Sequence, residues 1–273
     1  MLTTKHSWAY FNIQIKRGGC IEGHSVFITG AAKGIGYELA VAFAKLGSRV
    51  MISDLKEEDL KQAVAKSDVP IEYVVCDVTD EQAIKQAILE THRRFGRVDV
   101  LINNAGLQHV DWLEEFPTET YESMIKIMLV APFIAMKHAI PIMKKQNYGR
   151  IINVASINGV IGFEGKAAYN SAKHGVIGLT KVAALETAPH GITVNAICPG
   201  YVNTSLVENQ YEEIAQLKNI TKEEAKEALF QLIPQNRLLE IEEITQYVLY
   251  IASEGAKGLT GQALIIDGGY TAK

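Results

Sequence analysis

The chain has 273 residues, of which 48% are hydrophobic and 21% are charged, and its mean hydropathy is +0.05. This composition excludes a disordered or fibrous chain. The formal net charge is −4 without a block of basic residues, so the sequence predicts no nucleic-acid partner. No apolar run approaches the length of a membrane span, and we expect no membrane partner.

The cysteines predict no disulfide framework. Cys20, Cys76 and Cys198 are odd in number and far apart, which is typical of reduced thiols in a cytoplasmic protein. The seven histidines show no metal-ligand spacing, so no metal site is predicted. Residues 1–20 precede the first predicted strand and are expected to form a disordered extension.

Short apolar runs rich in β-branched residues alternate with helical patterns along the chain. The runs cover residues 25–29, 49–53, 71–76, 98–103, 149–155, 192–197 and 263–266, and the helical patterns cover 35–46, 81–95, 121–144 and 169–187. Such alternation indicates a parallel sheet that helices cover on both faces. We therefore predict an α/β fold with a single Rossmann-like, doubly wound sheet, in one domain that spans residues 21–273.

Residues 206–238 depart from this alternation and read as polar helical segments. They follow the carboxyl end of a predicted strand, where open α/β sheets bind ligands. We expect a small helical lid before the last strand, with a plain surface hairpin as the alternative.

A glycine-rich turn follows the first predicted strand. Gly30, Gly34 and Gly36 stand in the spacing G-x-x-x-G-x-G between a strand and a helix. Glycines at such a turn allow a backbone to approach a pyrophosphate, and the helix N-terminus supplies amide donors. The turn predicts a dinucleotide site, although the spacing alone is weak evidence.

Two acidic residues follow the next two predicted strands. Asp54 could accept hydrogen bonds from an adenosine ribose and repel a 2′-phosphate, which favours NAD over NADP. Asp54 could instead be the N-cap of a helix, ahead of Glu57. Lys33 and Lys56 could attract a 2′-phosphate, which would favour NADP. Asp77 could accept from the adenine amino group, or cap a helix beginning near Thr79.

A serine, a tyrosine and a lysine carry the predicted chemistry. Tyr169 and Lys173 are four residues apart and so share one face of a helix. A nearby ammonium favours the phenolate, and lowering the pKa of the tyrosine from about 10 to about 7 needs roughly 4 kcal/mol. Tyr169 could then exchange a proton with an alcohol or carbonyl oxygen that Ser156 holds.

Together these motifs resemble the short-chain dehydrogenase/reductase family from about residue 23 to the C-terminus. The resemblance joins the glycine turn, Asn103-Asn104-Ala105-Gly106, Ser156, the Y-x-x-x-K pair and Pro199-Gly200. It implies an NAD(P)-dependent alcohol oxidoreductase with Ser156, Tyr169 and Lys173 catalytic. The pattern and the resemblance give these cofactor-binding residues: Gly30, Lys33, Gly34, Ile35, Gly36, Asp54, Asp77, Val78, Asn104, Tyr169, Lys173, Val202 and Thr204.

One residue departs from the family pattern. Met128 stands where the family usually has an asparagine that anchors a water in its proton relay. Met128 cannot hold that water, so the relay from Lys173 to solvent must use another acceptor or run less efficiently.

Further segments resemble the D-3-hydroxybutyrate dehydrogenases of this family, including Gly106-Leu107-Gln108-His109 and the ending Asp267-Gly268-Gly269-Tyr270. The resemblance implies that NAD-dependent interconversion of D-3-hydroxybutyrate and acetoacetate is the reaction. Carried over by position, the substrate-binding residues are Gln108, Ser156, Asn158, Lys166, Tyr169 and Gln210. A cation with two amide donors suits a short hydroxy acid, because charge-assisted hydrogen bonds are the stronger kind.

Some of these residues have other readings. Without the resemblance, Lys166 would be a solvated surface lysine. Asn158 stands where some of these dehydrogenases have a histidine against the carboxylate, which leaves another small hydroxy acid or a polyol as the alternative substrate. A second alternative, an NAD(H)-binding sensor with weak turnover, has only Met128 in its favour.

The helical pattern after the fourth strand carries an apolar face. Ile125, Met128, Leu129, Phe133 and Met136 could belong to the core or to a subunit contact. The resemblance implies a homo-oligomer, either a dimer or a tetramer.

Overall fold

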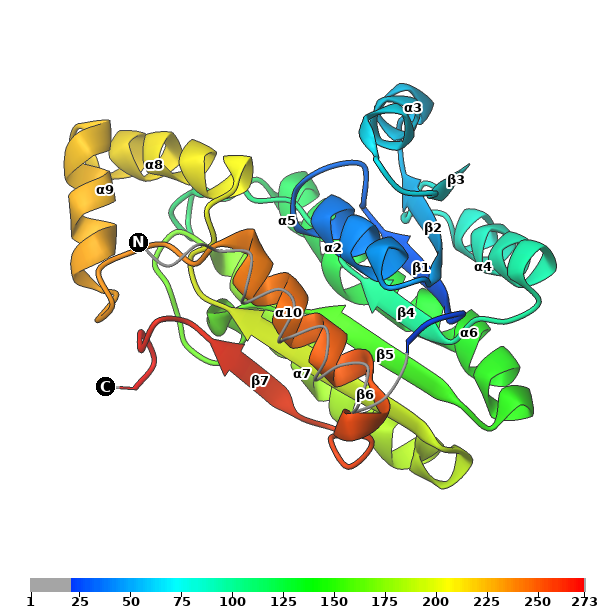
Figure 1. Cartoon of the computed structure of the whole chain (residues 1–273). Helices are drawn as coiled ribbons and strands as arrows, with labels where there is room; N and C mark the ends of the chain where they lie inside the picture. Colours follow the sequence, from blue (N-terminus) through cyan, green and yellow to red (C-terminus); the bar gives the residue numbers. More distant parts are fainter. Residues whose placement is uncertain (1–20, 273) are drawn as a thin grey trace, which may run out of the picture.

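A computed structural model describes residues 21–272, and the extension expected at residues 1–20 lies outside the described residues. The chain forms one seven-stranded sheet in the order β3-β2-β1-β4-β5-β6-β7 (Figure 1). Every neighbouring pair is parallel. The strands are β1 (Ser25–Thr29), β2 (Arg49–Asp54), β3 (Glu72–Val75), β4 (Val100–Asn103), β5 (Gly149–Val154), β6 (Ile192–Pro199) and β7 (Ala263–Ile266). The prediction of a doubly wound parallel sheet is confirmed.

The central strands are buried on both faces, which explains their continuous apolar sequence. All residues of β1, β4 and β6 are buried. The edge strand β3 has no fully buried residue, and its span is shorter than the predicted one. A parallel strand covered on both faces has no solvent-facing side, so its residues need not alternate in polarity.

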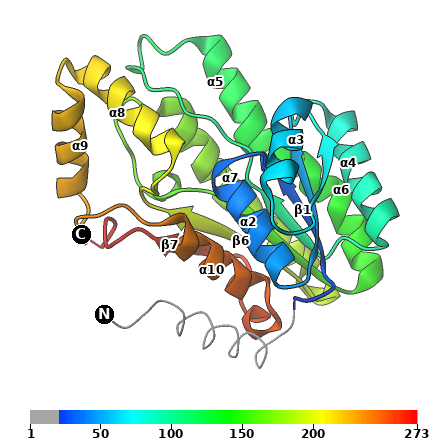
Figure 2. The ribbon, with the colours of Figure 1, turned by 45° about the horizontal axis from the view of Figure 1, so that its top comes forward.

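Helices cover both faces of the sheet, as Figure 2 shows. On one face, α2 (Gly34–Lys45), α3 (Glu57–Lys66) and α10 (Ile241–Ala252) contribute to one apolar cluster. On the other face, α4 (Glu81–Phe95), α6 (Ala131–Gln146) and α7 (Ala167–Thr187) contribute to a second cluster. These two clusters form the main core.

The helix predicted over 121–144 is a continuous segment, Thr118–Gln146, made of α5 (Thr118–Ile125), a π-helical turn η1 (Lys126–Val130) and α6. By length and composition alone this segment could cross a membrane. In this structure Ala135, Ala139 and Met143 pack in the core. Along the predicted apolar face, Met128 and Met136 are buried, whereas Phe133 is 49% exposed.

The predicted lid consists of α8 (Ser205–Lys218) and α9 (Lys222–Gln231), which lie beside the carboxyl ends of the strands in Figure 1. Thr221 begins α9 with a reciprocal capping box to Glu224. An ion pair between Lys218 and Glu164 (3.1 Å) ties α8 to the loop before α7. The remaining short turns are the 3-10 helices η2 (Ile157–Gly159), η3 (Ala188–His190) and η4 (Glu254–Ala256).

The strand order determines where in the sheet a ligand-binding crevice is expected. β1 pairs with β2 on one side and with β4 on the other, so the chain reverses its winding direction between β1 and β4. Loops leaving these strands diverge at their carboxyl ends and open a crevice, where open α/β sheets bind ligands.

Candidate active site

A cavity of about 760 Å³ lies at the carboxyl ends of the strands. It brings together every site residue predicted from the sequence except Gly36, with walls from the loops after β1, β2, β3, β4, β5 and β6 and from α7 and α8. No residue of α9 lines it. A cavity of this volume is ample for a dinucleotide head group and a small substrate.

The glycine turn has the conformation that its sequence predicts. Gly30 has φ +62°, and a Cβ at this position would lie 2.6 Å from the Ala105 Cα. Gly34 has φ +60° and faces open space within the cavity. A Cβ at Gly36 would lie 2.5 Å from the Asn104 side-chain nitrogen, so Gly36 serves close packing rather than lining the cavity. The conformation of this turn therefore suits the close approach of a dinucleotide, which the glycine spacing predicts.

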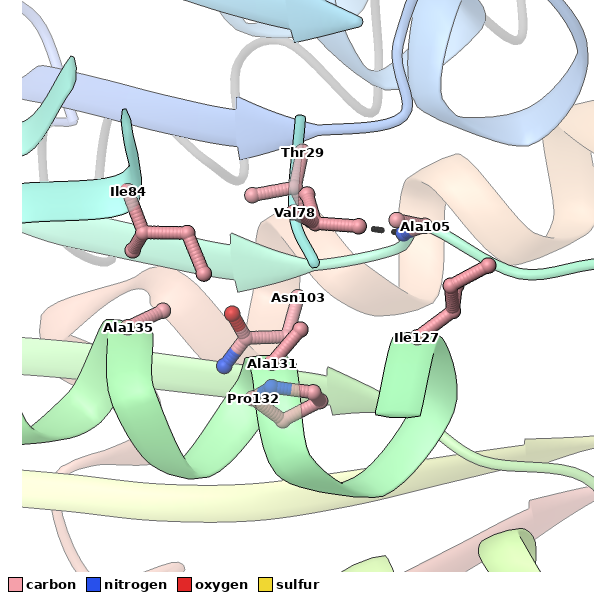
Figure 3. Close-up of a pocket in the computed structure, with 9 residues that line it drawn as sticks. All are labelled: Thr29, Val78, Ile84, Asn103, Ala105, Ile127, Ala131, Pro132 and Ala135. Atoms are coloured by element: carbon pink, nitrogen blue, oxygen red, sulfur yellow. Dashed lines mark hydrogen bonds between the residues drawn. The ribbon is translucent and has the colours of Figure 1, made fainter. Parts of the chain in front are cut away.

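Asn104 braces the glycine turn from the neighbouring strand. Its side-chain amide donates to the carbonyl oxygens of Thr29 (3.1 Å) and Gly30 (2.7 Å). The Thr29 hydroxyl accepts from the backbone of Asn104 (3.1 Å) and of Ala105 (3.3 Å), the latter shown in Figure 3. These bonds lock the loops after β1 and β4 together. The bracing role of Thr29 was not predicted, although the residue belongs to the glycine motif.

A second cavity of about 10 Å³ lies below this brace, between the ends of β1 and β4 and the start of α6 (Figure 3). That volume matches about one water molecule. It cannot hold a substrate, so the larger cavity is the candidate site.

The two acidic residues have different surroundings. Asp54 ends β2 and accepts from the backbone of Ala32 (3.1 Å) and of Leu55 (2.8 Å). Asp54 is not an N-cap, because the N-cap of α3 is Lys56. Asp77 accepts from the Thr79 backbone (2.8 Å) and lines the cavity; the N-cap of α4 is Asp80.

The remaining predicted cofactor residues also line the cavity. Lys33, Ile35 and Val78 lie around the glycine end. Val202 is buried after β6 and pairs with Leu239 in an isolated bridge.

Ser156, Tyr169 and Lys173 meet where β5, β6 and α7 converge. Ser156 follows β5, is 9% exposed, and its hydroxyl accepts from the Asn158 backbone (3.1 Å). Lys173 is buried and donates to the Val154 carbonyl oxygen (2.6 Å), and its Nζ lies 5.4 Å from the centre of the Tyr169 ring. A serine hydroxyl, a phenol and an amine thus line one polar corner.

The expected depression of the tyrosine pKa is not found. Burial raises the pKa of Tyr169 to about 12, and the contact with the Ser156 hydroxyl only partly opposes this. Burial also lowers the pKa of Lys173 to about 8. The lysine bonds to a carbonyl beside the ring, and desolvation outweighs the attraction that the four-residue spacing suggested.

Lys166 is almost fully buried, at 2% exposure, so the surface-lysine reading is wrong. It precedes α7 and donates to Gln210 Oε1 on α8 (3.0 Å). Its Nζ lies 4.5 Å from the centre of the Phe163 ring and 5.4 Å from that of Tyr201. Burial lowers its pKa to about 8. The two aromatic neighbours were not predicted as site residues.

Asn158 and Gln108 are the other two predicted substrate residues. Asn158 is buried beside Ser156. Gln108 donates to the His109 carbonyl oxygen (3.0 Å), while its buried Oε1 has no hydrogen-bond partner among the described residues. Both residues line the cavity that Lys166 and Gln210 also line, and Gln108 Oε1 is available to accept from a ligand.

Met128 lies in the π-helical turn and is 1% exposed. It packs in a cluster with Met124, Ala168 and Ala172, against which Tyr169 also packs. A thioether in this apolar cluster has no capacity to anchor a water, as the sequence indicated.

Comparison with known proteins places this fold and site in a family. A family model described as enoyl-(acyl carrier protein) reductase matches residues 30–271. The uncharacterized oxidoreductase YxjF of Bacillus subtilis (strain 168) is 55% identical over 250 residues, 90% of this chain and 97% of that protein. The D-beta-hydroxybutyrate dehydrogenase of Rhizobium meliloti (strain 1021) is 38% identical over 252 residues, 90% of this chain and 98% of that enzyme.

A solved structure agrees with these sequence matches. The crystal structure of an NAD+-bound xylitol dehydrogenase superposes with a TM-score of 0.88 at 33% identity, covering 91% of this chain and 99% of that one. The chain belongs to the short-chain dehydrogenase/reductase family. It is therefore an oxidoreductase whose cofactor is of the NAD(P) class.

Proposed function

We propose that this protein interconverts D-3-hydroxybutyrate and acetoacetate with NAD as its cofactor. The observation that carries the proposal is the buried hydrogen bond between Lys166 and Gln210 (3.0 Å) in the wall of the cavity that holds Ser156 and Tyr169. The similarity to the D-beta-hydroxybutyrate dehydrogenase of Rhizobium meliloti supports it.

Lys166 is the residue that suits an anionic substrate. A buried cation costs solvation energy unless it is paired, and in this structure its hydrogen bond goes to a neutral amide oxygen. A substrate carboxylate would supply a directly bonded anionic partner, with Gln108, Asn158 and Gln210 as neutral partners.

The proton transfer falls to Tyr169. A bound nicotinamide cofactor would supply the hydride-transfer chemistry at this site. Ser156 holds the alcohol or carbonyl oxygen, and Tyr169 takes the hydroxyl proton during oxidation or returns it during reduction. Lys173, fixed on the Val154 carbonyl beside the ring, is the cation that would stabilise the phenolate against the burial that raises the pKa of Tyr169.

Asp54 supports NAD rather than NADP. Its carboxylate is held by two backbone amides at the end of β2, where it lines the cavity. A fixed negative charge at this place repels a 2′-phosphate and accepts from ribose hydroxyls.

The test is the loss of NADH absorbance when acetoacetate is added to the purified protein, with NADPH and a sugar ketone in parallel. We expect turnover with NADH and acetoacetate. No turnover with any ketone, together with tight NADH binding, would contradict the proposal and favour the sensor.

A polyol is the second candidate substrate. The similarity to the NAD+-bound xylitol dehydrogenase and the neutral Asn158 beside Ser156 favour it. Oxidation of xylitol at a higher kcat/KM than D-3-hydroxybutyrate would select it.

We also propose that residues 21–273 act as one domain of a cytoplasmic homo-oligomer, a dimer or a tetramer. The single sheet supports the proposal of one domain. The buried free thiols Cys76 and Cys198 are compatible with a reducing compartment such as the cytoplasm. Exposed apolar side chains on α6 and α7, Phe133, Val182 and Leu185, support self-association.

A further inference from the structure

A second charged residue lies one helical turn from Gln210. Glu213 is three residues further along α8, so the two side chains share a face of the helix. Gln210 is 5% exposed and bonds Lys166, which fixes the direction in which this face points. Glu213 does not line the cavity that Lys166 and Gln210 line. It therefore lies outside the cavity lining, one helical turn from Gln210.

No hydrogen bond among the described residues accounts for the burial of the Glu213 carboxylate. Glu213 is half-buried, and its Oε2 is buried without a hydrogen-bond partner among the described residues. The preceding residue, Glu212, is exposed and pairs with Lys222 (2.9 Å). The two neighbouring carboxylates thus differ in surroundings, and Glu213 is the more buried of the two.

The charged groups around this carboxylate come from two other segments. Lys166 precedes α7, and His109 lies in the loop after β4; both lower the pKa of Glu213, which burial raises. His109 itself lies 3.9 Å from Asp111. In turn, the Glu213 charge opposes the burial that lowers the pKa of Lys166. Tyr201 also faces Lys166, with its ring centre 5.4 Å from the ammonium, but it is neutral because burial raises its pKa.

We propose that Glu213 is a positioning residue that acts through its charge: held on the Gln210 face of α8, its carboxylate increases the fraction of Lys166 that is protonated, so that the site binds a carboxylate substrate up to a higher pH than it would without Glu213. The carboxylate substrate in this statement rests on the proposed function. The effect on Lys166 does not, because it requires only the arrangement of α8 and the loop before α7.

The Glu213 charge acts on an anionic ligand in two opposite ways. It repels the anion directly, and it favours the protonated form of Lys166, which attracts the anion. Well below pH 8, Lys166 is protonated with or without Glu213, and removing a nearby negative charge cannot weaken the binding of an anion. Above pH 8, loss of Glu213 leaves less of Lys166 protonated, and anion binding weakens. A pH-dependent crossover therefore distinguishes this role from a structural one.

The first experiment measures Lys166 without any substrate. Competitive acetylation of the NAD-loaded protein with acetic anhydride, read by mass spectrometry from pH 6.5 to 10, gives the titration midpoint of this amine. We expect a lower midpoint in Glu213→Gln, and a midpoint close to wild type in Glu213→Asp and in the matched control Glu212→Gln. An unchanged midpoint in Glu213→Gln overturns the proposal.

The second experiment measures acetoacetate binding to the NAD-loaded enzyme by calorimetry, where both partners are oxidised and no reaction occurs. For Glu213→Gln we expect Kd to rise about 3- to 10-fold at pH 8.5, since one unit of pKa changes a protonated fraction by up to tenfold. At pH 6.5 we expect Kd to be unchanged or lower. Neutral methyl acetoacetate should show no such crossover.

The outcomes separate the two proposals. Equal weakening at both pH values would indicate a structural role and overturn the assignment of Glu213. Wild-type protein that binds no acetoacetate, with the acetylation shift intact, would overturn the proposed substrate and leave the coupling of Glu213 to Lys166 supported.

Discussion

The Lys173 ammonium lies 2.6 Å from the carbonyl oxygen of Val154, the last residue of β5. This bond fixes the lysine between the strand and the Tyr169 ring, although burial lowers the pKa of the amine to about 8. Burying a lysine costs solvation energy. A buried lysine with a lowered pKa is therefore typical of a functional site rather than of a contact that stabilises the fold.

Replacing Tyr169 with phenylalanine tests the proton transfer. We expect Tyr169→Phe to lower kcat by about 100-fold to 10,000-fold, the usual contribution of general acid–base catalysis. Affinity for NADH, from fluorescence titration, should stay within about twofold, because the cavity keeps its shape. Tyr73→Phe is the control, since Tyr73 lies on the edge strand and bonds only Glu57 (3.4 Å) in the described structure. A kcat in Tyr169→Phe equal to that of the wild type would contradict the proposed role of Tyr169 in proton transfer.

Replacing Lys166 with alanine tests carboxylate recognition. KM for D-3-hydroxybutyrate should rise about 10- to 100-fold, because loss of a charge-assisted hydrogen bond costs about 1.5 to 3 kcal/mol. KM for NAD should change little. Lys218→Ala removes an exposed lysine that pairs with Glu164 and should leave both constants unchanged. An unchanged KM for the hydroxy acid in Lys166→Ala would remove the carboxylate assignment.

The sequence predicted the sheet well because its central strands are mostly apolar runs that helices bury on both faces. It also placed the residues of the site at the ends of those strands, since Asp54 ends β2, Asn104 directly follows β4 and Ser156 lies two residues after β5. Strand ends that are consecutive in a doubly wound fold meet at one edge, so this part needs no tertiary information.

Electrostatics could not be predicted in the same way. The spacing of Tyr169 and Lys173 suggested a low phenol pKa, but burial raises it, and burial depends on how α7 packs. Likewise Glu213 reads as one of several acids on a polar helix. The Lys166–Gln210 bond shows which face of α8 is turned toward the site, and Glu213 shares that face, three residues after Gln210.

Replacing Asp54 with asparagine tests the choice of cofactor. Asp54→Asn keeps an acceptor for the Ala32 or Leu55 backbone amide but removes the charge. We expect the ratio of kcat/KM for NAD to that for NADP to fall about 10- to 100-fold, corresponding to about 1.4 to 2.7 kcal/mol. Asp77→Asn changes the same charge at another part of the cavity wall and should alter this ratio much less. A ratio that stays constant in Asp54→Asn would show that Asp54 does not select the cofactor.

Replacing Met128 with leucine tests whether its side chain takes part in proton transfer. Met128 is buried in an apolar cluster against which Tyr169 packs. Met128→Leu preserves volume and polarity, so the free energy of unfolding should fall by less than about 1.5 kcal/mol. We expect kcat to stay within about twofold, because a thioether holds no water for a relay. A tenfold loss of kcat with intact stability would mean that this position affects catalysis through more than packing.

Replacing Lys166 with methionine tests the cost of its burial. The pKa of Lys166 lies near 8 in the folded protein, below its ordinary value of 10.5, so the unfolded chain binds more protons between these pH values. The folded state is therefore penalised below pH 8, and the penalty disappears as pH rises from 8 to 10.5. The shift corresponds to about 3 kcal/mol, and loss of the bond to Gln210 offsets about 1 kcal/mol of it.

We therefore expect Lys166→Met, free of cofactor, to exceed wild type in free energy of unfolding by about 2 kcal/mol at pH 7, measured by urea denaturation. The difference should diminish by pH 9.5, as the wild-type amine loses its proton in the folded state. Lys222→Met is the control: its exposed amine, paired with Glu208 and Glu212, has a raised pKa, so its removal should bring no gain. A gain for Lys166→Met that is constant from pH 7 to pH 10 would show that packing, rather than the buried charge, sets the difference.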